Sequence, residues 1–529
     1  VSTFKGIEDG TFPSGTSKYE RPTAAISVPE WIPENCIQCN QCAASCPHAT
    51  IRPVLATEEE VEKAPEGFIV RDFQGPVKGL KFRIVIDPQD CYGCGICANT
   101  CPARNKALVM KPIETQLDKQ KLWDYAMTLP RKANPVNKNT IRGAMFEPTY
   151  FEFSGACAGC GETPYVHLVT QLFGDRMNIA NATGCSSIYG ASAPSMPYTT
   201  NAEGCGPAWA NSLFEDNAEF GLGMHLGETK LRDRLASRVE ALLPAADDDT
   251  KAVMQEWLDK KDQGEGTRDR AQKFEAALRA EVAQHPEYKE LLDMKDHFIK
   301  RSQWIFGGDG WAYDIGFGGL DQVLASGEDV NVLVLDTEVY SNTGGQSSKS
   351  TPAAAIAKFA ASGKKTKKKD LGMIAVSYGY IYVAQIALGA DMNQAIKAIT
   401  EAENYPGPSL IIAYSPCINH GLKAGMGKSQ DEEKRAVECG YWCNWRYNPT
   451  LLEQGKNPFH LDSRPPKGNF REYLLGEVRF SSLATLFPDK AEELFEKTER
   501  DAKERRANYV RIQKSYDDML KEMAEADKK

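Results

Sequence analysis

The chain has 529 residues, of which 42% are hydrophobic and 26% are charged, and its formal net charge is −9. This balance is typical of soluble globular domains. The net negative charge does not indicate the excess of basic residues that is typical of nucleic-acid binding. The sequence holds no apolar run of the roughly 18 residues that a membrane span requires, and it shows no signal peptide. We therefore expect a cytoplasmic protein that binds neither nucleic acid nor a membrane.

The chain opens in loop-like sequence. Its first residue is Val1 rather than Met, and Pro13, Pro22 and Pro29 interrupt any regular periodicity. We predict that residues 1–30 are a connector from a preceding domain, so that the chain continues a longer polypeptide or was cut from one.

Two cysteine runs with the same spacing, Cys-x2-Cys-x2-Cys-x3-Cys-Pro, follow within residues 31–130. The cysteines of the two runs are Cys36, Cys39, Cys42 and Cys46, then Cys91, Cys94, Cys97 and Cys101. In bacterial-type ferredoxins, three cysteines of such a run hold one [4Fe–4S] cluster and the fourth ligates the other cluster. We therefore predict a small α+β ferredoxin-like domain in which Cys101 completes the first cluster and Cys46 the second. A pair of zinc sites is the alternative, although zinc usually takes two separated Cys-x2-Cys pairs.

Cysteines in this spacing also indicate a reducing compartment rather than a disulfide framework. Between the two runs, Phe82–Asp87 has the character of a strand.

From residue 131 to 529, strand and helix patterns alternate. This alternation predicts an α/β domain with a mostly parallel sheet and helices on both faces. The expected strands are Met177–Ala182, Trp304–Phe306, Val330–Leu335, Leu371–Val376 and Ser409–Tyr414. Helices are expected to begin near Thr163, Thr351 and Asp391, the first two with Pro as the next residue.

Three charged segments complete this part of the chain. Residues 228–300 are predicted to form a helical insertion on the surface. Residues 489–529 have apolar residues at three- and four-residue steps, which predicts a helix packed on the domain or covering a subunit. The lysine-rich run Lys364–Lys369 is interpreted as a solvated loop, with a docking patch for an acidic electron carrier as the alternative.

Four further cysteines share a local context although they are far apart in sequence. Cys157 and Cys160 precede an expected helix, whereas Cys185 and Cys417 each follow an expected strand. In a parallel α/β sheet these loops gather at the carboxyl edge, where ligands bind. The four cysteines are therefore candidates for one more cluster, with a zinc site or unrelated thiols as alternatives. The cysteines without such a pattern, expected to pack in the core, are Cys205, Cys439 and Cys443.

A glycine-rich turn and a second strand end suggest a diphosphate and Mg²⁺ site. Gly308-Asp309-Gly310 follows one expected strand, and Thr337 follows the next. Glycine lets the backbone approach a phosphate, and a carboxylate is a preferred Mg²⁺ ligand. This arrangement resembles the thiamine-diphosphate binding motif, which usually has Asn where Thr337 stands. A hydroxyl can still ligate Mg²⁺, and the carbonyl of Val339 could complete the set. A glycine-rich turn without a cofactor is the alternative.

Taken together, these motifs resemble the C-terminal part of the single-chain pyruvate:ferredoxin (flavodoxin) oxidoreductases, a thiamine-diphosphate family of 2-oxoacid oxidoreductases. Three segments also resemble sequences of that family, namely Gly204–Glu219, Gly308–Gly316 and Asn342–Gln346. The resemblance implies that Cys157, Cys160, Cys185 and Cys417 hold a cluster next to the cofactor. It implies Mg²⁺ ligation by Asp309, Thr337 and the carbonyl of Val339. The implied thiamine-diphosphate contacts are Glu162, Cys185, Gly308, Asp309, Gly310, Trp311, Thr337, Glu338, Val339, Tyr340, Ser341 and Asn342, of which Asn342 is also the candidate catalytic residue.

The resemblance also implies the reaction. Pyruvate and coenzyme A would be converted to acetyl-CoA and CO2, and electrons would pass through three [4Fe–4S] clusters to ferredoxin or flavodoxin in anaerobic metabolism. The family's N-terminal part carries the activating Glu, the Arg for the substrate carboxylate and the coenzyme A site. We therefore expect this chain to need that part, as a separate chain or a removed segment, within a homodimer of the complete enzyme.

Two alternatives stay open from the sequence. One is another 2-oxoacid:ferredoxin oxidoreductase, acting on 2-oxoglutarate or on a branched or aromatic oxoacid. The other is a non-catalytic electron-transfer chain with an inactive α/β domain.

Overall fold

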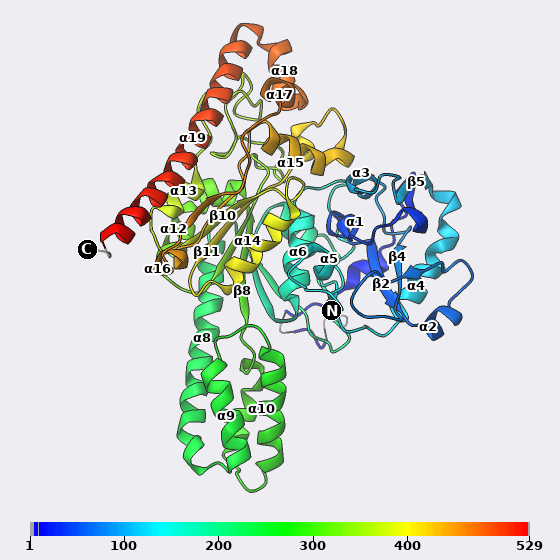
Figure 1. Ribbon diagram of the computed structural model, residues 1–529, viewed down its shortest axis with the longest axis vertical. Coiled ribbons are helices and arrows are strands. Elements are labelled where there is room, and N and C mark those ends of the chain that lie inside the picture. Colours follow the sequence, from blue (N-terminus) through cyan, green and yellow to red (C-terminus); the bar gives the residue numbers. More distant parts are fainter. Residues whose placement is uncertain (1–4, 9, 527–529) are drawn as a thin grey trace.

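An eight-stranded sheet forms the centre of the molecule (Figure 1), and the computed structural model describes residues 5–8 and 10–526. The strand order is β13-β12-β10-β11-β9-β8-β6-β7. The six parallel strands are β6 Met177–Ala182, β7 Ala208–Ser212, β8 Ser302–Gly308, β9 Asn331–Asp336, β10 Tyr382–Ile386 and β11 Ser409–Tyr414. The antiparallel strands at one edge are β12 Trp445–Tyr447 and β13 Phe459–Leu461.

Both faces of this sheet are buried, because successive residues of the central strands enter different hydrophobic clusters. In β9, Leu333 and Leu335 pack on one side, and Val332 and Val334 pack on the other. The helices that contribute to the first side are α6 Thr163–Phe173 and α14 Met392–Asn404. Those that contribute to the second are α12 Phe317–Ala325, α13 Leu371–Val376 and α19 Pro488–Ala526. Parallel sheets covered in this way read as continuous apolar runs, which is why these strands were visible in the sequence.

The cysteine-run module packs against the first side of the sheet. Its strands are β1 Ser27–Trp31, β2 Ile51–Ala56, β3 Arg71–Asp72, β4 Lys81–Ile86 and β5 Leu108–Pro112. Its helices are α1 Gln41–Ala44, α2 Glu58–Glu62, α3 Ile96–Thr100, α4 Gln120–Thr128 and α5 Ile141–Ala144. One hydrophobic cluster runs from Phe82 and Ile84 of this module to Leu333 of the sheet. The two parts therefore share a core.

The end of the predicted connector differs from expectation. Strand β1 pairs antiparallel with β5, so the last residues of the segment 1–30 are ordered rather than irregular. Residues 1–4 and 9 of that segment lie outside the described residues.

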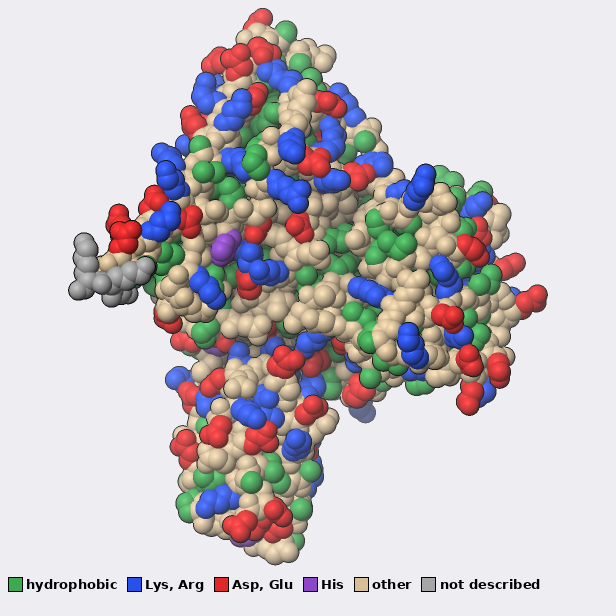
Figure 2. Space-filling model, viewed as in Figure 1, with side chains coloured by type: hydrophobic (Ala, Val, Ile, Leu, Met, Phe, Trp, Pro, Cys, Tyr) green, Lys and Arg blue, Asp and Glu red, His purple; other side chains and the backbone are tan. Residues whose placement is uncertain are grey.

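Four helices between β7 and β8 form an arm that projects from the body (Figure 1). They are α8 Asn217–Leu242, α9 Asp248–Lys260, α10 Thr267–Glu281 and α11 Tyr288–Asp293. The arm has a hydrophobic cluster of its own around Trp257, Phe274 and Phe298. Figure 2 shows acidic and basic side chains interspersed over its visible face.

The C-terminal region returns to the second side of the sheet. Its helices before α19 are α15 Ser429–Glu438, α16 Thr450–Glu453, α17 Phe470–Leu475 and α18 Val478–Leu486. Helix α19 buries Leu494 and Tyr509 of the predicted apolar stripe, whereas Met523 near its end is 55% exposed, and residues 527–529 lie outside the described part. Among the described helices, none combines the length and the hydropathy needed to cross a membrane.

Two predicted elements are wrong. Leu371–Val376 forms helix α13 rather than a strand, because the Asp370 carboxylate caps its first turn by accepting from the N–H of Met373. A short apolar run does not separate the two alternatives by itself. No helix begins at Thr351, because Ser348 and Thr351 close a turn by reciprocal bonds between each backbone N–H and the other hydroxyl.

The separate core of the arm generates a prediction. Trp257 is 1% exposed, so we expect Trp257→Ala to destabilise the arm by about 3–5 kcal/mol. Hydrogen exchange should rise over residues 217–299, while the iron content of the protein stays unchanged. Leu231→Ala in helix α8 of the arm is the control, because the Leu231 side chain is 41% exposed and its loss should leave the core of the arm intact. Equal protection of the arm in the two variants would contradict the prediction.

Candidate active site

The eight cysteines of the two runs divide into two groups in space. Burial raises the pKa of the Cys42 thiol well above its ordinary value, and the neighbouring thiols that add to this shift are Cys39, Cys36 and Cys101. Burial also raises the pKa of Cys97, and the thiols that add to this shift are Cys91, Cys94, Cys46 and, last, Cys42. Cys101 therefore lies with the first run and Cys46 with the second. We call the groups the first site (Cys36, Cys39, Cys42, Cys101) and the second site (Cys46, Cys91, Cys94, Cys97).

The loops that carry these thiols turn tightly around them. Asn40 and Gly95, which precede helices α1 and α3, both have left-handed backbone conformations with φ of 61° and 81°. Backbone N–H groups also point at sulfur, since Gly93 donates to Cys91 and Ala107 donates to Cys101, each at 3.4 Å. Groups of four mostly buried thiols suit iron, which takes soft thiolate ligands.

The four dispersed cysteines also meet, at the carboxyl edge of the sheet. Burial raises the pKa of Cys185, and Glu162, Cys417 and Cys157 add to the shift. Burial likewise raises the pKa of Cys160, with Glu162 and Cys185 among its charged neighbours. We call Cys157, Cys160, Cys185 and Cys417 the third site. Its members come from the loop before α6, from the short helix α7 Cys185–Ser187 after β6, and from the loop after β11.

Glu162 is buried among these thiols. It is 4% exposed, and its Oε2 has no hydrogen-bond partner among the described residues. Burial raises the pKa of its carboxyl to about 7, while Tyr189 acts in the opposite direction. An unpartnered buried carboxyl at this position suits contact with a bound group, and the cofactor contact of Glu162 stays a prediction.

Three oxygen atoms converge where β8 and β9 end. The Thr337 hydroxyl lies 3.0 Å from Asp309 Oδ1 and 3.0 Å from the carbonyl oxygen of Val339. The Ser348 hydroxyl donates to Asp309 Oδ2 at 2.6 Å. Burial and the neighbouring Asp336 raise the pKa of Asp309 to about 8. This set of oxygens fits a hard divalent cation such as Mg²⁺, whose charge would favour the ionised carboxylate.

The remaining predicted contacts surround this point. Gly310 begins the π-helical turn Gly310–Ile315, and a Cβ there would lie 2.5 Å from the Tyr340 ring. Trp311 is 2% exposed, and its indole N–H has no partner among the described residues. Ser341 Oγ lies 3.3 Å from the Cys185 sulfur, so the loop after β9 touches the third site. Asn342 is exposed one residue further on.

His420 links the third site to the Thr337 loop, and sequence reasoning missed it. Its ring is fully buried, and Nε2 lies 2.6 Å from the carbonyl oxygen of Thr337. Because that carbonyl only accepts, Nε2 carries the proton, which leaves Nδ1 to accept from the Cys417 N–H at 3.4 Å. Burial lowers the pKa of His420 to about 3. The only signal in the sequence was its position three residues after Cys417.

A buried ion network holds the residues on both sides of Thr337. Lys368 Nζ lies 2.7 Å from Asp336 and 2.9 Å from Glu338, and Arg479 lies 2.8 Å from Glu338. Burial opposes ionisation of Glu338, but Lys368 and Arg479 prevail and lower its pKa to about 2. The Glu338 carboxylate is thus engaged within the protein, so its predicted cofactor contact can rest only on its backbone.

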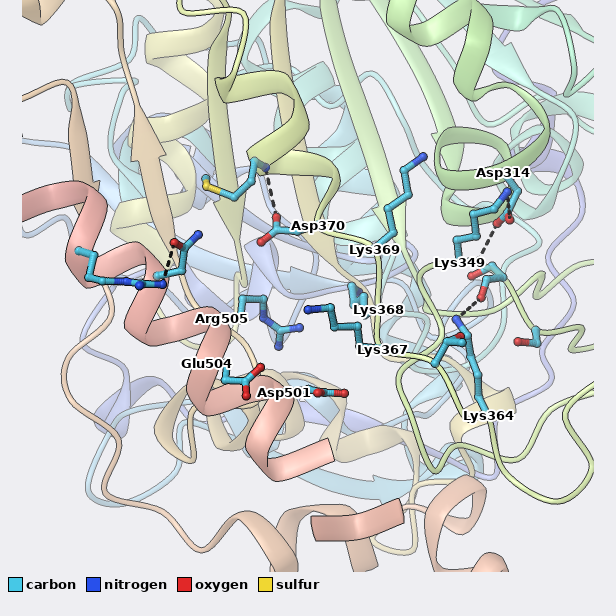
Figure 3. A pocket seen from close by; sticks show the side chains of 16 residues that line it. Asp314, Lys349, Lys364, Lys367, Lys368, Lys369, Asp370, Asp501, Glu504 and Arg505 are labelled. Carbon is cyan, nitrogen blue, oxygen red and sulfur yellow. Dashed lines mark hydrogen bonds and ion pairs between the residues drawn. The ribbon is translucent and has the colours of Figure 1, made fainter. Parts of the chain in front are cut away.

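The interpretation of Lys364–Lys369 as a solvated loop is therefore wrong for half of its residues. Lys368 is 8% exposed, Lys364 donates to the carbonyl of Ser348 at 2.7 Å, and Lys369 donates to the carbonyl of Tyr313 at 3.0 Å. Lys365 and Lys367 are exposed. A cavity of about 840 Å³ lies between this run and α19, and Figure 3 shows Asp501, Glu504 and Arg505 facing it from the helix. Burial and neighbouring lysines lower the pKa of Lys364 and of Lys369 to about 8.

The second site lies against the third site. Asn99, which follows Cys97, donates to the carbonyl of Gly427 at 2.8 Å. The backbone of Gly159, between two cysteines of the third site, lowers the pKa of Cys94, which burial raises to about 11. The second site is thus a neighbour of the third, and through Cys97 and Cys42 it is also a neighbour of the first.

Two family models match separate parts of the chain. Residues 35–105 match the 4Fe-4S dicluster domain, and residues 293–413 match the C-terminal TPP-binding domain of thiamine pyrophosphate enzymes. The chain accordingly contains iron–sulfur and thiamine-diphosphate binding modules, in the α/β and ferredoxin-like folds that the sequence predicted.

Curated relatives match nearly the whole chain. A pyruvate-flavodoxin oxidoreductase of Enterobacter agglomerans is 62% identical, and one of Klebsiella pneumoniae is 61% identical. A pyruvate:ferredoxin oxidoreductase of Moorella thermoacetica is 56% identical. Each match covers 97% of this chain but 44% of the relative, so the chain spans less than half the length of these relatives.

The crossed arrangement of the first two sites generates a prediction. Cys36→Ala and Cys101→Ala should each remove about four irons, the content of one cubane, and the double variant should lose no more than either single variant. Cys36→Ala combined with Cys46→Ala should instead remove both clusters. Iron analysis and electron paramagnetic resonance (EPR) of the reduced protein measure these losses. A larger loss from the Cys36/Cys101 pair than from either single change would contradict crossed ligation.

The buried ion network around Lys368 leads to a second prediction for this site. Lys368→Met leaves Asp336 and Glu338 buried without their shared ammonium group, which we expect to cost about 3–5 kcal/mol. Lys367→Met, at the exposed neighbour, should change stability by less than about 0.5 kcal/mol. Chemical denaturation of both variants tests the difference, and equal stability would show that Lys368 is not a structural partner.

Proposed function

We propose that this chain, which belongs with the pyruvate-flavodoxin and pyruvate:ferredoxin oxidoreductases over almost its whole length, is the part of such an enzyme that binds cofactor diphosphate and carries electrons away. The complete enzyme would convert pyruvate and coenzyme A to acetyl-CoA and CO2 in the cytoplasm. Two electrons would leave one at a time to ferredoxin or flavodoxin.

One observation carries this proposal. Cys185 lies beside the loop that follows Thr337, with Ser341 Oγ 3.3 Å from its sulfur, and its electrostatic neighbours include the dispersed Cys157, Cys160 and Cys417. An electron-accepting site in contact with a cofactor loop is what a carrier of single electrons needs in order to draw on a two-electron reaction. A ferredoxin module without that convergence would support electron transfer alone.

The residues have distinct roles in the proposal. Asp309, Thr337 and the carbonyl of Val339 would hold Mg²⁺ and through it the diphosphate, and Gly310 leaves room for the ring of Tyr340 beside them. When bound there, thiamine diphosphate would supply the carbon nucleophile and the electron sink that decarboxylation of a 2-oxoacid needs. Asn342, exposed at the end of the same loop, would contact the substrate. His420 keeps the Thr337 carbonyl in place through its Nε2–H.

The order of the three cysteine sites supports a direction for electron flow. The third site adjoins the cofactor loop, the second site adjoins the third, and Cys42 of the first site is a neighbour of Cys97 of the second. The first site would therefore meet the external acceptor. The remaining part of the complete enzyme would supply the activating carboxylate, the substrate-binding Arg and the coenzyme A site, and the complete enzyme would be a homodimer.

The proposal is tested in the complete enzyme, purified without oxygen. We expect about twelve irons, four for each of three clusters, one thiamine diphosphate, and pyruvate-dependent reduction of flavodoxin or ferredoxin. Cys417→Ala should remove about four irons and abolish reduction of the acceptor, while dithionite still reduces the other two clusters. Cys205→Ala is the control, because Cys205 lies outside all three sites.

Two outcomes would count against the proposal. Full iron content in the Cys417 variant would exclude the third cluster. Faster reduction with 2-oxoglutarate or a branched or aromatic oxoacid than with pyruvate would shift the substrate to the alternative class.

A further inference from the structure

His48 lies at the boundary between the second and third sites. It comes two residues after Cys46, is 2% exposed, and packs against the loop that leads to Cys157. Its Nδ1 lies 2.9 Å from the carbonyl oxygen of Ser154, and its own carbonyl accepts the N–H of Phe153 at 2.9 Å. A single residue of the second site's loop therefore makes a side-chain and a backbone bond to the loop of the third site.

The proton on the imidazole can be assigned from these partners. The Ser154 carbonyl only accepts, so Nδ1 carries the hydrogen and donates it. The backbone of Cys157 also lies close enough to influence the His48 ring. The contact thus reaches a cysteine of the third site from a residue next to a cysteine of the second.

The other face of the ring is fixed by Tyr92. The two rings are stacked, with centroids 4.1 Å apart and planes inclined by 11°. Tyr92 directly follows Cys91, so the stack holds together both segments that contribute to the second site. The ring of His48 is therefore held on one face by Tyr92 and at its edge by the Ser154 carbonyl.

The loop that His48 meets is not held by a regular element. Phe153 has a left-handed backbone with φ of 55°, which costs free energy in a non-glycine residue. Its N–H is bonded to the His48 carbonyl, so the same contact that orients the loop also stabilises this conformation. The side-chain bond from His48 to Ser154 adds to this backbone bond in holding the segment that leads to Cys157.

We propose that His48 is a positioning residue that fixes the gap between the second and third sites and so sets the rate of electron transfer between them. The inference rests on the proposed function, in that both sites hold clusters. The physical reason is that transfer between two carriers slows steeply as the gap between them widens. Nothing in this role requires His48 to bind iron or to change its protonation state.

Two substitutions separate the hydrogen bond from the stack. In His48→Asn the amide nitrogen takes the place of Nδ1 and can still donate to Ser154, but the ring is lost. In His48→Phe the stack on Tyr92 remains, but the Ser154 carbonyl is left buried without its donor, an expensive state. Tyr92→Phe, which keeps its ring, is the matched control for changes near the second site.

The experiment uses the complete enzyme, with electron transfer followed by rapid-freeze EPR after mixing with pyruvate and coenzyme A. We expect the second site to be reduced several-fold more slowly in His48→Phe than in the native enzyme, because the two loops are no longer held at their native separation. Reduction of the third site should be unchanged. His48→Asn should recover most of the rate, and Tyr92→Phe should match the native enzyme.

The outcomes are distinguishable from failure of the proposed function. Iron content and the EPR signals after dithionite report whether the clusters are present, independently of rate. If pyruvate did not reduce even the native third site, the proposed function would fail, and a photochemical reductant would still measure transfer between sites. Native transfer rates in His48→Phe and His48→Asn, with all clusters present, would overturn the positioning role. Equal slowing at the third site would also overturn it, because the change would then lie upstream.

Discussion

The buried ammonium group of Lys368 is the interaction on which the site depends. It joins Asp336, the last residue of β9, to Glu338, and so spans Thr337 from both sides. Glu338 has φ of 59°, a conformation that a side chain of this size rarely adopts without support. A buried pair of this kind stabilises little relative to apolar contacts, but the loss of one partner leaves an uncompensated buried charge. Between these anchors, the Thr337 hydroxyl lies 3.0 Å from both Asp309 Oδ1 and the Val339 carbonyl oxygen.

The second constraint is the shared core between the cysteine-run module and the sheet. Because Phe82 and Leu333 belong to one hydrophobic cluster, the two parts cannot slide past each other without exposing apolar surface. On top of that broad contact, a few directed bonds, such as those of His48 and Asn99, set the local register of the loops. Burial provides the strength of the junction, and hydrogen bonds provide its precision.

The sequence predicted those features that depend on local pattern. The spacing of the two cysteine runs, the buried strands such as Met177–Ala182 and the apolar stripe of α19 are all read within a few residues. It failed where a residue is decided by a distant partner. The sequence does not show that Lys368 is paired with Asp336, so Lys368 was predicted to be solvated. It likewise does not show that His420 bonds to the Thr337 carbonyl, so His420 was not identified. The strand prediction for Leu371–Val376 was wrong for a different reason. A short apolar run is compatible with a strand or a helix, and here the cap from Asp370 favours the helix.

The distribution of the third-site cysteines has a consequence for biogenesis. In sequence, Cys157 and Cys417 flank all the strands of the parallel sheet, and the four cysteines come together only when β6, β8, β9 and β11 have paired. Iron delivered before that point would find two thiols near residue 160 and nothing to complete the set. Cluster loading at this position would therefore be a late step of maturation, and a cell lacking the loading machinery should accumulate a folded, iron-poor protein rather than an unfolded one.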